Sequence, residues 1–196
     1  MSGIGLVVPR RVTKPVGRVR QTRLKLLRAF NKLVLERGYA KMTVDDVIKE
    51  AGVGRSTFYE HFETKDDILR RSLTPLFSAF ASSLGEPKPT EQLVGIVRHF
   101  WENRRLAHAM FGGAMRPPAS GVLSDLLEER LGVEASRSRM SKPLVPARLM
   151  AAHLAEGQLG LIDAWVSGRA ASTAEALARL IHDSANASVA TWRTVR

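Results

Sequence analysis

The stretch from Thr43 to Lys65 constrains the possible fold of this chain more than any other part of its sequence. Thr43 and Asp46 stand three residues apart, the spacing at which a hydroxyl and a carboxylate bond the free amides at the start of a helix. Gly52 then permits the positive φ that a sharp reversal of the backbone needs. A second helix is expected over residues 55–62. We therefore predict two short helices joined by a tight turn.

The second helix of this pair has an apolar side and a polar side. Phe58 and Phe62 are four residues apart, so both face the same way and are expected to pack into a core. The other side chains face outward and are polar or aromatic: Arg55, Ser56, Thr57, Tyr59, Glu60 and His61. A helix-turn-helix that places such a surface in the major groove reads DNA. The sequence therefore predicts contacts to base edges from four residues: Arg55, Ser56, Thr57 and His61.

Positive charge is concentrated around these helices. Residues 1–65 contain 14 of the 30 Lys and Arg residues but only 6 of the 19 Asp and Glu residues. Solubility does not require localised charge, whereas a polyanionic partner explains it. Residues 1–19 combine Gly and Pro with basic side chains, a composition that does not pack by itself. This segment is either a solvated tail or a basic arm that follows DNA through Arg10 and Arg11.

Six ordered motifs between Arg20 and Leu69 resemble the DNA-binding domain of TetR-family transcriptional regulators. The motifs are Gly38-Tyr39, Thr43-Val44, Ala51-Gly52-Val53, Thr57-Phe58-Tyr59, His61-Phe62 and Thr64-Lys65-Asp66. The chain departs from the family pattern at Ile48, where a small residue is common, and at Gly54, where Ser is common. The resemblance implies that Tyr59 and Lys65 hold DNA phosphates. Thr43, at a helix start, is a further candidate for backbone contact.

The rest of the chain is expected to be helical, which makes the fold class all-α. The resemblance implies a flexible basic arm over residues 1–19, a three-helix helix-turn-helix domain over 20–66, and an effector-binding and dimerisation domain over 67–196. Pro75 is expected to kink or break a helix that begins after Thr64. Pro117 and Pro118 are expected to stop a helix, and Ser172 is expected to cap the last one.

Two functions of the C-terminal domain follow from the resemblance. The last two helices, near residues 146–167 and 173–193, carry many small residues and are expected to form a homodimer interface, although packing within one bundle is the alternative. Several apolar residues lie on helices that surround an effector cavity in the family, although each is also a good core residue. The candidate pocket residues are Phe77, Phe80, Phe100, Trp101, Met110 and Phe111, with His153 and Gln158 as polar members.

Enzymatic and metal sites find little support in the sequence. No two of the five histidines stand three or four residues apart, the spacing that places metal ligands on one helical ridge. His182 and Asp183 are adjacent, and consecutive residues on a helix are expected to point apart. No apolar run is long enough to span a bilayer, so we expect a soluble, cytoplasmic chain without a cofactor or a metal.

The function expected from these features is that of a ligand-responsive regulator of transcription. It is expected to bind a near-palindromic operator as a homodimeric repressor and to be released by a small lipophilic effector. A constitutive or architectural DNA-binding dimer without an effector is the alternative, and a body without a cavity would favour it. An enzyme is the third hypothesis, which a metal or strongly coupled titrating groups would favour.

Overall fold

The computed structural model describes residues 16–137 and 145–194, and these residues form helices and no strands. The all-α prediction is confirmed. In chain order the helices are α1 (Val16–Arg37), the 3-10 turn η1 (Tyr39–Lys41), α2 (Val44–Ala51), α3 (Arg55–Tyr59), α4 (Lys65–Ser82), α5 (Glu91–Glu102), α6 (Arg104–Phe111), the 3-10 turn η2 (Gly113–Met115), α7 (Arg116–Arg137), α8 (Ala147–Val166) and α9 (Ala174–Thr194). Across the two described ranges, no helix is long and apolar enough to cross a membrane.

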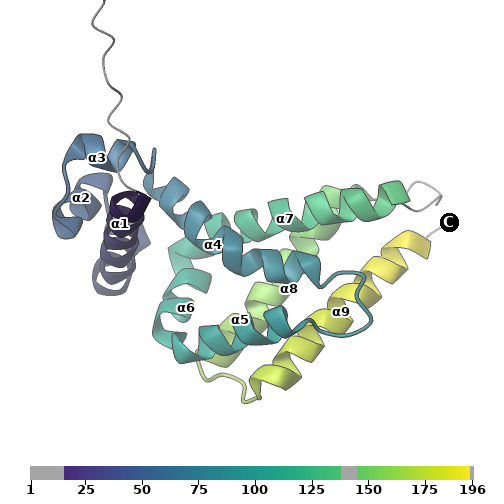
Figure 1. Ribbon diagram of the computed structural model, residues 1–196. Coiled ribbons are helices and arrows are strands. Elements are labelled where there is room, and N and C mark those ends of the chain that lie inside the picture. The colour runs from purple at the N-terminus through teal and green to yellow at the C-terminus, as the bar shows by residue number, and fades with distance from the viewer. Residues whose placement is uncertain (1–15, 138–144, 195–196) are drawn as a thin grey trace, which may run out of the picture.

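Helices α1, α2 and α3 form a head at one end of the molecule (Figure 1). The long helix α1 packs against α2, and α2 packs against α3. Phe30 of α1, Val47 of α2 and Phe58 of α3 are fully buried. The head therefore has an apolar centre to which each of its three helices contributes, as the helical spacing of these residues predicts.

Helix α4 leads from the head into a larger helical body (Figure 1). In the body α7 packs against both α8 and α4, and α5 packs against α9. Pro75 lies inside α4, which continues on both sides of it from Lys65 to Ser82. The helix therefore tolerates the lost N–H of this proline. Of the two predicted effects, a kink or a break, the break does not occur.

The body also contacts the head away from α4. Helix α6 packs against α1, and η2 packs against η1. Movement of α6 within the body would therefore change its contacts with the head.

Several predicted helix boundaries were wrong. Pro117 and Pro118 lie in the first turn of α7, where a missing N–H costs no helical hydrogen bond, so they begin a helix rather than stop one. The residue that caps α9 is Thr173, whose hydroxyl accepts a hydrogen bond from the amide of Ala176 at 3.1 Å, whereas Ser172 does not cap it. Helix α1 begins at Val16, within the range 1–19 that was predicted to be a flexible arm, because extending a nucleated helix by a turn costs little.

Candidate nucleic-acid interface and effector cavity

The short helix α3 is held on the head by two phenylalanines. Phe58 has no exposed surface and Phe62, just after the helix, has 1%. The two rings are 6.1 Å apart, centre to centre. α3 ends at Tyr59 rather than at Phe62, yet Phe62 occupies the predicted apolar position because the backbone continues to turn through Glu60 and His61.

Three of the predicted base-contacting residues, Arg55, Ser56 and Thr57, lie on this helix, and His61 lies in the turn that follows it. Arg55 and Ser56 are exposed, while Thr57 and His61 are half-buried. Tyr59, a predicted phosphate contact, is 52% exposed. Gly54 caps α3 without a side-chain hydrogen bond, so the first amides of the helix are left to water or a bound anion. The arrangement brings a polar and cationic surface together at one end of the molecule.

Arg55 forms an ion pair that sequence reasoning missed. Its guanidinium lies 2.5 Å from a carboxylate oxygen of Asp45 on α2, and both side chains are about two-thirds exposed, at 64% and 67%. An ion pair this exposed contributes little to stability because water screens it. The pair with Asp45 can therefore be exchanged for another partner of Arg55 at small cost.

Thr43 acts as a helix cap in the structure. Its hydroxyl donates to a carboxylate oxygen of Asp46 at 2.7 Å, its amide donates to the same oxygen at 2.9 Å, and the hydroxyl accepts from the Asp46 amide at 3.2 Å. These bonds from Thr43, together with the charge of Arg37, hold the pKa of Asp46 below its ordinary value of 3.8. Both donors of Thr43 are thus bonded within the chain, which leaves neither for a DNA phosphate.

Lys65, the first residue of α4, contacts the 3-10 turn η1 and the residue that follows it. Its ammonium donates to the carbonyl oxygens of Tyr39 at 3.0 Å and Met42 at 3.1 Å, and it lies 4.4 Å from the centre of the Tyr39 ring. An ammonium has three donors, so one remains for a partner outside the chain. The side chain is half-buried. Arg10 and Arg11 lie outside the described residues.

A cavity of about 390 Å³ lies where the head meets the body. Residues of α1, α4, α5 and α6 line it, and three of the predicted pocket residues, Phe100, Met110 and Phe111, are among them. This volume is within the range of about 300–1,000 Å³ that small-molecule pockets occupy. The sequence did not predict that α1 lines the cavity, because helical spacing alone does not show which element the residues of α1 meet.

The structure separates the other predicted pocket residues from this cavity. Phe77 and Phe80 are buried behind it, against the rings of Phe111 and Phe100. Trp101 is 41% exposed and stacks on Trp165 of α8 with the ring centres 4.7 Å apart. His153 and Gln158 line a different depression, between α8 and α9.

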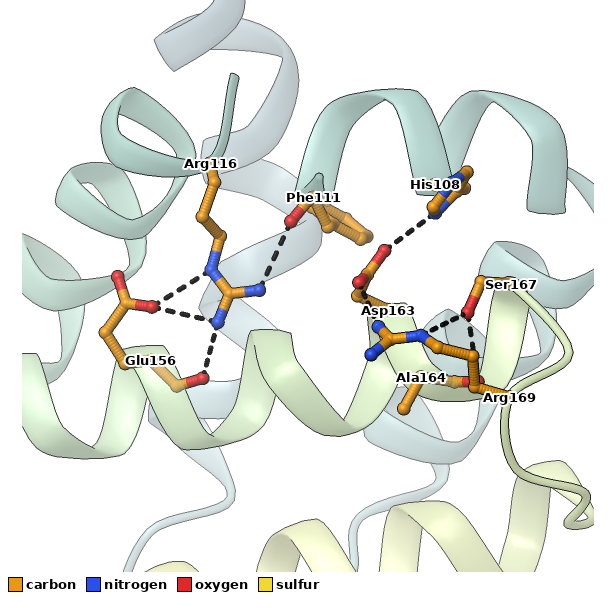
Figure 2. Close-up of polar contacts among 8 residues, drawn as sticks. All are labelled: His108, Phe111, Arg116, Glu156, Asp163, Ala164, Ser167 and Arg169. Carbon is orange, nitrogen blue, oxygen red and sulfur yellow. Dashed lines mark hydrogen bonds and ion pairs between the residues drawn. The ribbon is translucent and has the colours of Figure 1, made fainter. Parts of the chain in front are cut away.

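Polar contacts connect α6 and the start of α7 to α8 (Figure 2). The guanidinium of Arg116 bonds the carboxylate and the carbonyl of Glu156 and the carbonyl of Phe111, at distances of 2.8 to 3.2 Å. Hydrogen bonds from Ser120 and Arg116 hold the pKa of Glu156 below its ordinary value, against the opposing effect of burial. His108 contacts Asp163 at 2.8 Å.

The expectation that His182 and Asp183 point apart was wrong. Nδ1 of His182 lies 2.8 Å from the Asp183 carboxylate, and Nε2 lies 3.0 Å from the carbonyl oxygen of Glu86. The imidazole is 5% exposed. Both ring nitrogens therefore have partners within the fold, and the contact from Nε2 joins α9 to the loop before α5.

These observations define an all-α protein with a helix-turn-helix head and a separate helical body that contains a cavity. Residues 26–71 match the family described as bacterial regulatory proteins, tetR family. The chain is 34% identical over 67 residues to the HTH-type transcriptional regulator EthR of Mycolicibacterium smegmatis (strain ATCC 700084 / mc(2)155), a region that covers 34% of this chain and 30% of that protein. The match thus spans less than a third of that relative's length.

Solved structures extend the likeness over most of the chain. A TetR transcriptional regulator from Streptococcus agalactiae 2603V has 25% identity and a TM-score of 0.52, with 86% of this chain and 96% of that chain covered. A putative TetR-family regulator from Syntrophomonas wolfei str. Goettingen shares the fold, with 22% identity, a TM-score of 0.51, and coverage of 90% and 99%. Residues 26–71 therefore match the DNA-binding domain of the tetR family, and the chain shares the fold of TetR-family regulators over most of its length.

Proposed function

We propose that this protein is a homodimeric, ligand-responsive repressor that binds a near-palindromic DNA operator. The observation that carries the proposal is α3, a short helix that is anchored by the buried Phe58 and exposes Arg55, Ser56 and Tyr59. A helix of this kind can enter the major groove only if its outer side chains are exposed, as Arg55, Ser56 and Tyr59 are.

The exposed residues of the head support different roles on DNA. Arg55 has a planar guanidinium suited to bidentate contact with guanine, and Ser56, Thr57 and His61 are near enough along the chain to reach the same groove. Tyr59 and the remaining donor of Lys65 suit phosphate oxygens. Arg10 and Arg11 are proposed to add phosphate contacts from the arm.

An exposed face on α8 and α9 supports dimerisation. Leu149 on α8 is 59% exposed and Leu180 on α9 is 51% exposed, although both are large and apolar. Small residues, including Gly157, Ser184 and Ala187, line the depressions between the two helices. Small residues let a second pair of helices approach closely, and a two-fold dimer would present two copies of α3 to one palindromic site.

The cavity at the junction of head and body supports control by a small molecule. A body without a cavity would have favoured the alternative of a constitutive or architectural DNA-binding dimer. A ligand that binds one arrangement of head and body more tightly shifts the population of the protein toward that arrangement. The free energy by which the ligand changes operator affinity equals the free energy by which the operator changes ligand affinity. We propose release of the operator as the outcome of that shift.

Selection of bound fragments from genomic DNA, followed by footprinting, tests the proposal directly. We expect a protected site with two inverted half-sites about one helical turn or more apart. Arg55→Ala should lower affinity for that site by about tenfold or more and affect unrelated DNA much less. Lys88→Ala removes the same charge from the exposed loop after α4 and should change neither affinity. Selection of no consistent sequence, or wild-type affinity of Arg55→Ala, would contradict the proposal.

A further inference from the structure

The cavity between head and body has cations at one end. Arg20 and Arg23 of α1 and Arg71 of α4 line it, and no Asp or Glu does. Arg71 is paired with Asp67 at 2.7 Å. Arg20 and Arg23 form no ion pair with any residue in the described part of the chain. The lining therefore carries more positive than negative charge, and Asp67, which pairs with Arg71, offsets only part of it.

The three arginines belong to one region of the wall. Burial raises the pKa of Asp67, but hydrogen bonds from Arg71 and the Glu63 amide, with the charges of Arg71 and Arg23, lower it overall. Arg23 and Arg71 are thus near the same carboxylate. Arg20 stands one helical turn before Arg23 on the same side of α1. Because Arg20 and Arg23 are exposed, this end of the cavity opens to solvent.

The remainder of the wall is mainly apolar. Leu24 and Leu27 continue the stripe on α1, and Phe100, Met110 and Phe111 are buried at the body side, where the rings of Phe100 and Phe111 meet edge to face with centres 5.0 Å apart. Two polar residues of the lining, His99 of α5 and Asn103 just after it, bond each other at 3.3 Å. Apolar surface of this kind favours a hydrocarbon or aromatic group over water.

One polar atom of the wall lacks a partner. Oδ1 of Asn31, at the far end of the α1 stripe, is buried and accepts no hydrogen bond from any described residue. Arg20 and Asn31 are 11 residues apart, a distance of about 16 Å along the helix. The cavity is therefore cationic at its open end, apolar along its length, and able to accept one hydrogen bond at the other end.

We propose that this cavity binds an amphiphilic anion, a molecule with a carboxylate, sulfonate or phosphate at one end and an apolar remainder. Arg20 and Arg23 bind the anionic group, and the leucines and aromatic rings enclose the rest. The ligand touches α1 of the head and α4, α5 and α6 of the body together, so its binding free energy depends on how the head is set against the body. This regulatory consequence rests on the proposed function, whereas the site itself does not.

Calorimetric titration of the DNA-free protein with decanoate tests the site. Decanol and decylammonium have the same chain with no charge and with the opposite charge. We expect decanoate to bind at least about tenfold more tightly than either, because charge-assisted hydrogen bonds to arginine contribute only to the anion. Equal binding of the three probes, or no binding of decanoate, would overturn the proposal without bearing on the DNA-binding function.

A matched pair of variants locates the anionic group. Arg20→Gln/Arg23→Gln should weaken decanoate binding by about tenfold or more and leave decanol unchanged. Lys25→Gln/Arg28→Gln removes two charges from exposed positions of α1 outside the cavity and should leave decanoate binding unchanged. Thermal unfolding of each variant checks that the fold is retained. If both pairs weaken decanoate equally, only overall charge matters and the proposed site is wrong.

Measurement of operator affinity with and without decanoate tests the binding site and its proposed regulatory effect separately. If decanoate binds through Arg20 and Arg23 and lowers operator affinity, both the site and the regulation are supported. If it binds through them and leaves operator affinity unchanged, the site is supported and ligand-responsive release is contradicted. If Arg20→Gln/Arg23→Gln weakens DNA binding but not decanoate binding, the two arginines serve DNA and the proposed site is overturned.

Discussion

At the scale of single residues, two positions of the head show that a polar side chain predicted to contact DNA can have its partner within the fold. Thr43 uses both of its donors on Asp46, and Lys65 uses two of its three on carbonyl oxygens. A lysine in the first turn of α4 is unfavourable for the helix dipole, and the sequence therefore indicates that it has another partner. The carbonyls of Tyr39 and Met42 are that partner.

Lys65→Ala is expected to change both stability and DNA binding. Loss of two charge-assisted hydrogen bonds should lower the free energy of unfolding by about 1–2 kcal/mol, as measured by urea denaturation. Loss of one phosphate contact should make the salt dependence of DNA affinity shallower by about one unit of slope. Lys88→Ala is the control for charge. Unchanged stability would contradict the structural role, and an unchanged slope would contradict the phosphate contact.

At the scale of elements, the turn between α2 and α3 depends on two glycines that differ in conformation. Gly52 ends α2 with φ of 61° and ψ of 40°, in the left-handed region that side chains disfavour. Gly54 begins α3 with φ of −74°, which any residue adopts. An added Cβ at Gly54 would lie 3.9 Å from the nearest atom, the Thr57 hydroxyl, so the position has room for a side chain. Only the first glycine is required by the backbone.

Substitution of the two glycines should therefore have opposite effects on stability. Gly52→Ala should lower the free energy of unfolding by about 1–2 kcal/mol, because alanine is strained in the left-handed region. Gly54→Ser should raise it by a few tenths of a kcal/mol, because a serine hydroxyl can accept a bond from a free amide of α3. Urea denaturation measures both. Similar losses from the two substitutions would show that Gly54 is also held in a conformation that needs glycine.

At the scale of the whole molecule, the head lies at one end and α9 at the other (Figure 1). Leu149 and Leu180 are more exposed than the other large apolar residues on described helices, apart from Tyr59 of α3. Burial of such residues against a second copy would gain hydrophobic free energy that the monomer lacks. We assign the exposed face on α8 and α9 to the proposed dimer.

Leu180→Asp is expected to produce a monomer. In a two-fold dimer, the new carboxylate of one protomer would be buried near the same carboxylate of its partner. The free-energy cost of desolvating two like charges exceeds the free energy that the apolar contacts of the interface contribute. Light scattering after size-exclusion chromatography should give half of the wild-type mass, and operator affinity should fall. Leu35→Asp changes a leucine that is 48% exposed on α1 and should remain dimeric. A dimeric Leu180→Asp variant would place the interface elsewhere.

Local features of this protein follow from the sequence alone. The cap at Thr43, the left-handed glycine at 52, the buried pair Phe58 and Phe62, and the helical class of every described element all depend on residues within a turn or two of one another. Such contacts are set by helix periodicity and backbone conformation, which a sequence displays directly. The exposed side of α3, with Arg55, Ser56 and Tyr59, is predictable for the same reason.

Contacts between distant segments were decided only by the tertiary structure. Lys65 bonds a carbonyl 26 residues away, and Arg23 of α1 shares a cavity wall with Phe111 of α6. Trp101 and Phe100 are neighbours in the chain, yet one stacks on α8 at the surface and the other lines the cavity. Helical spacing shows which side chains share a face, but only the packing of one helix on another determines what that face meets.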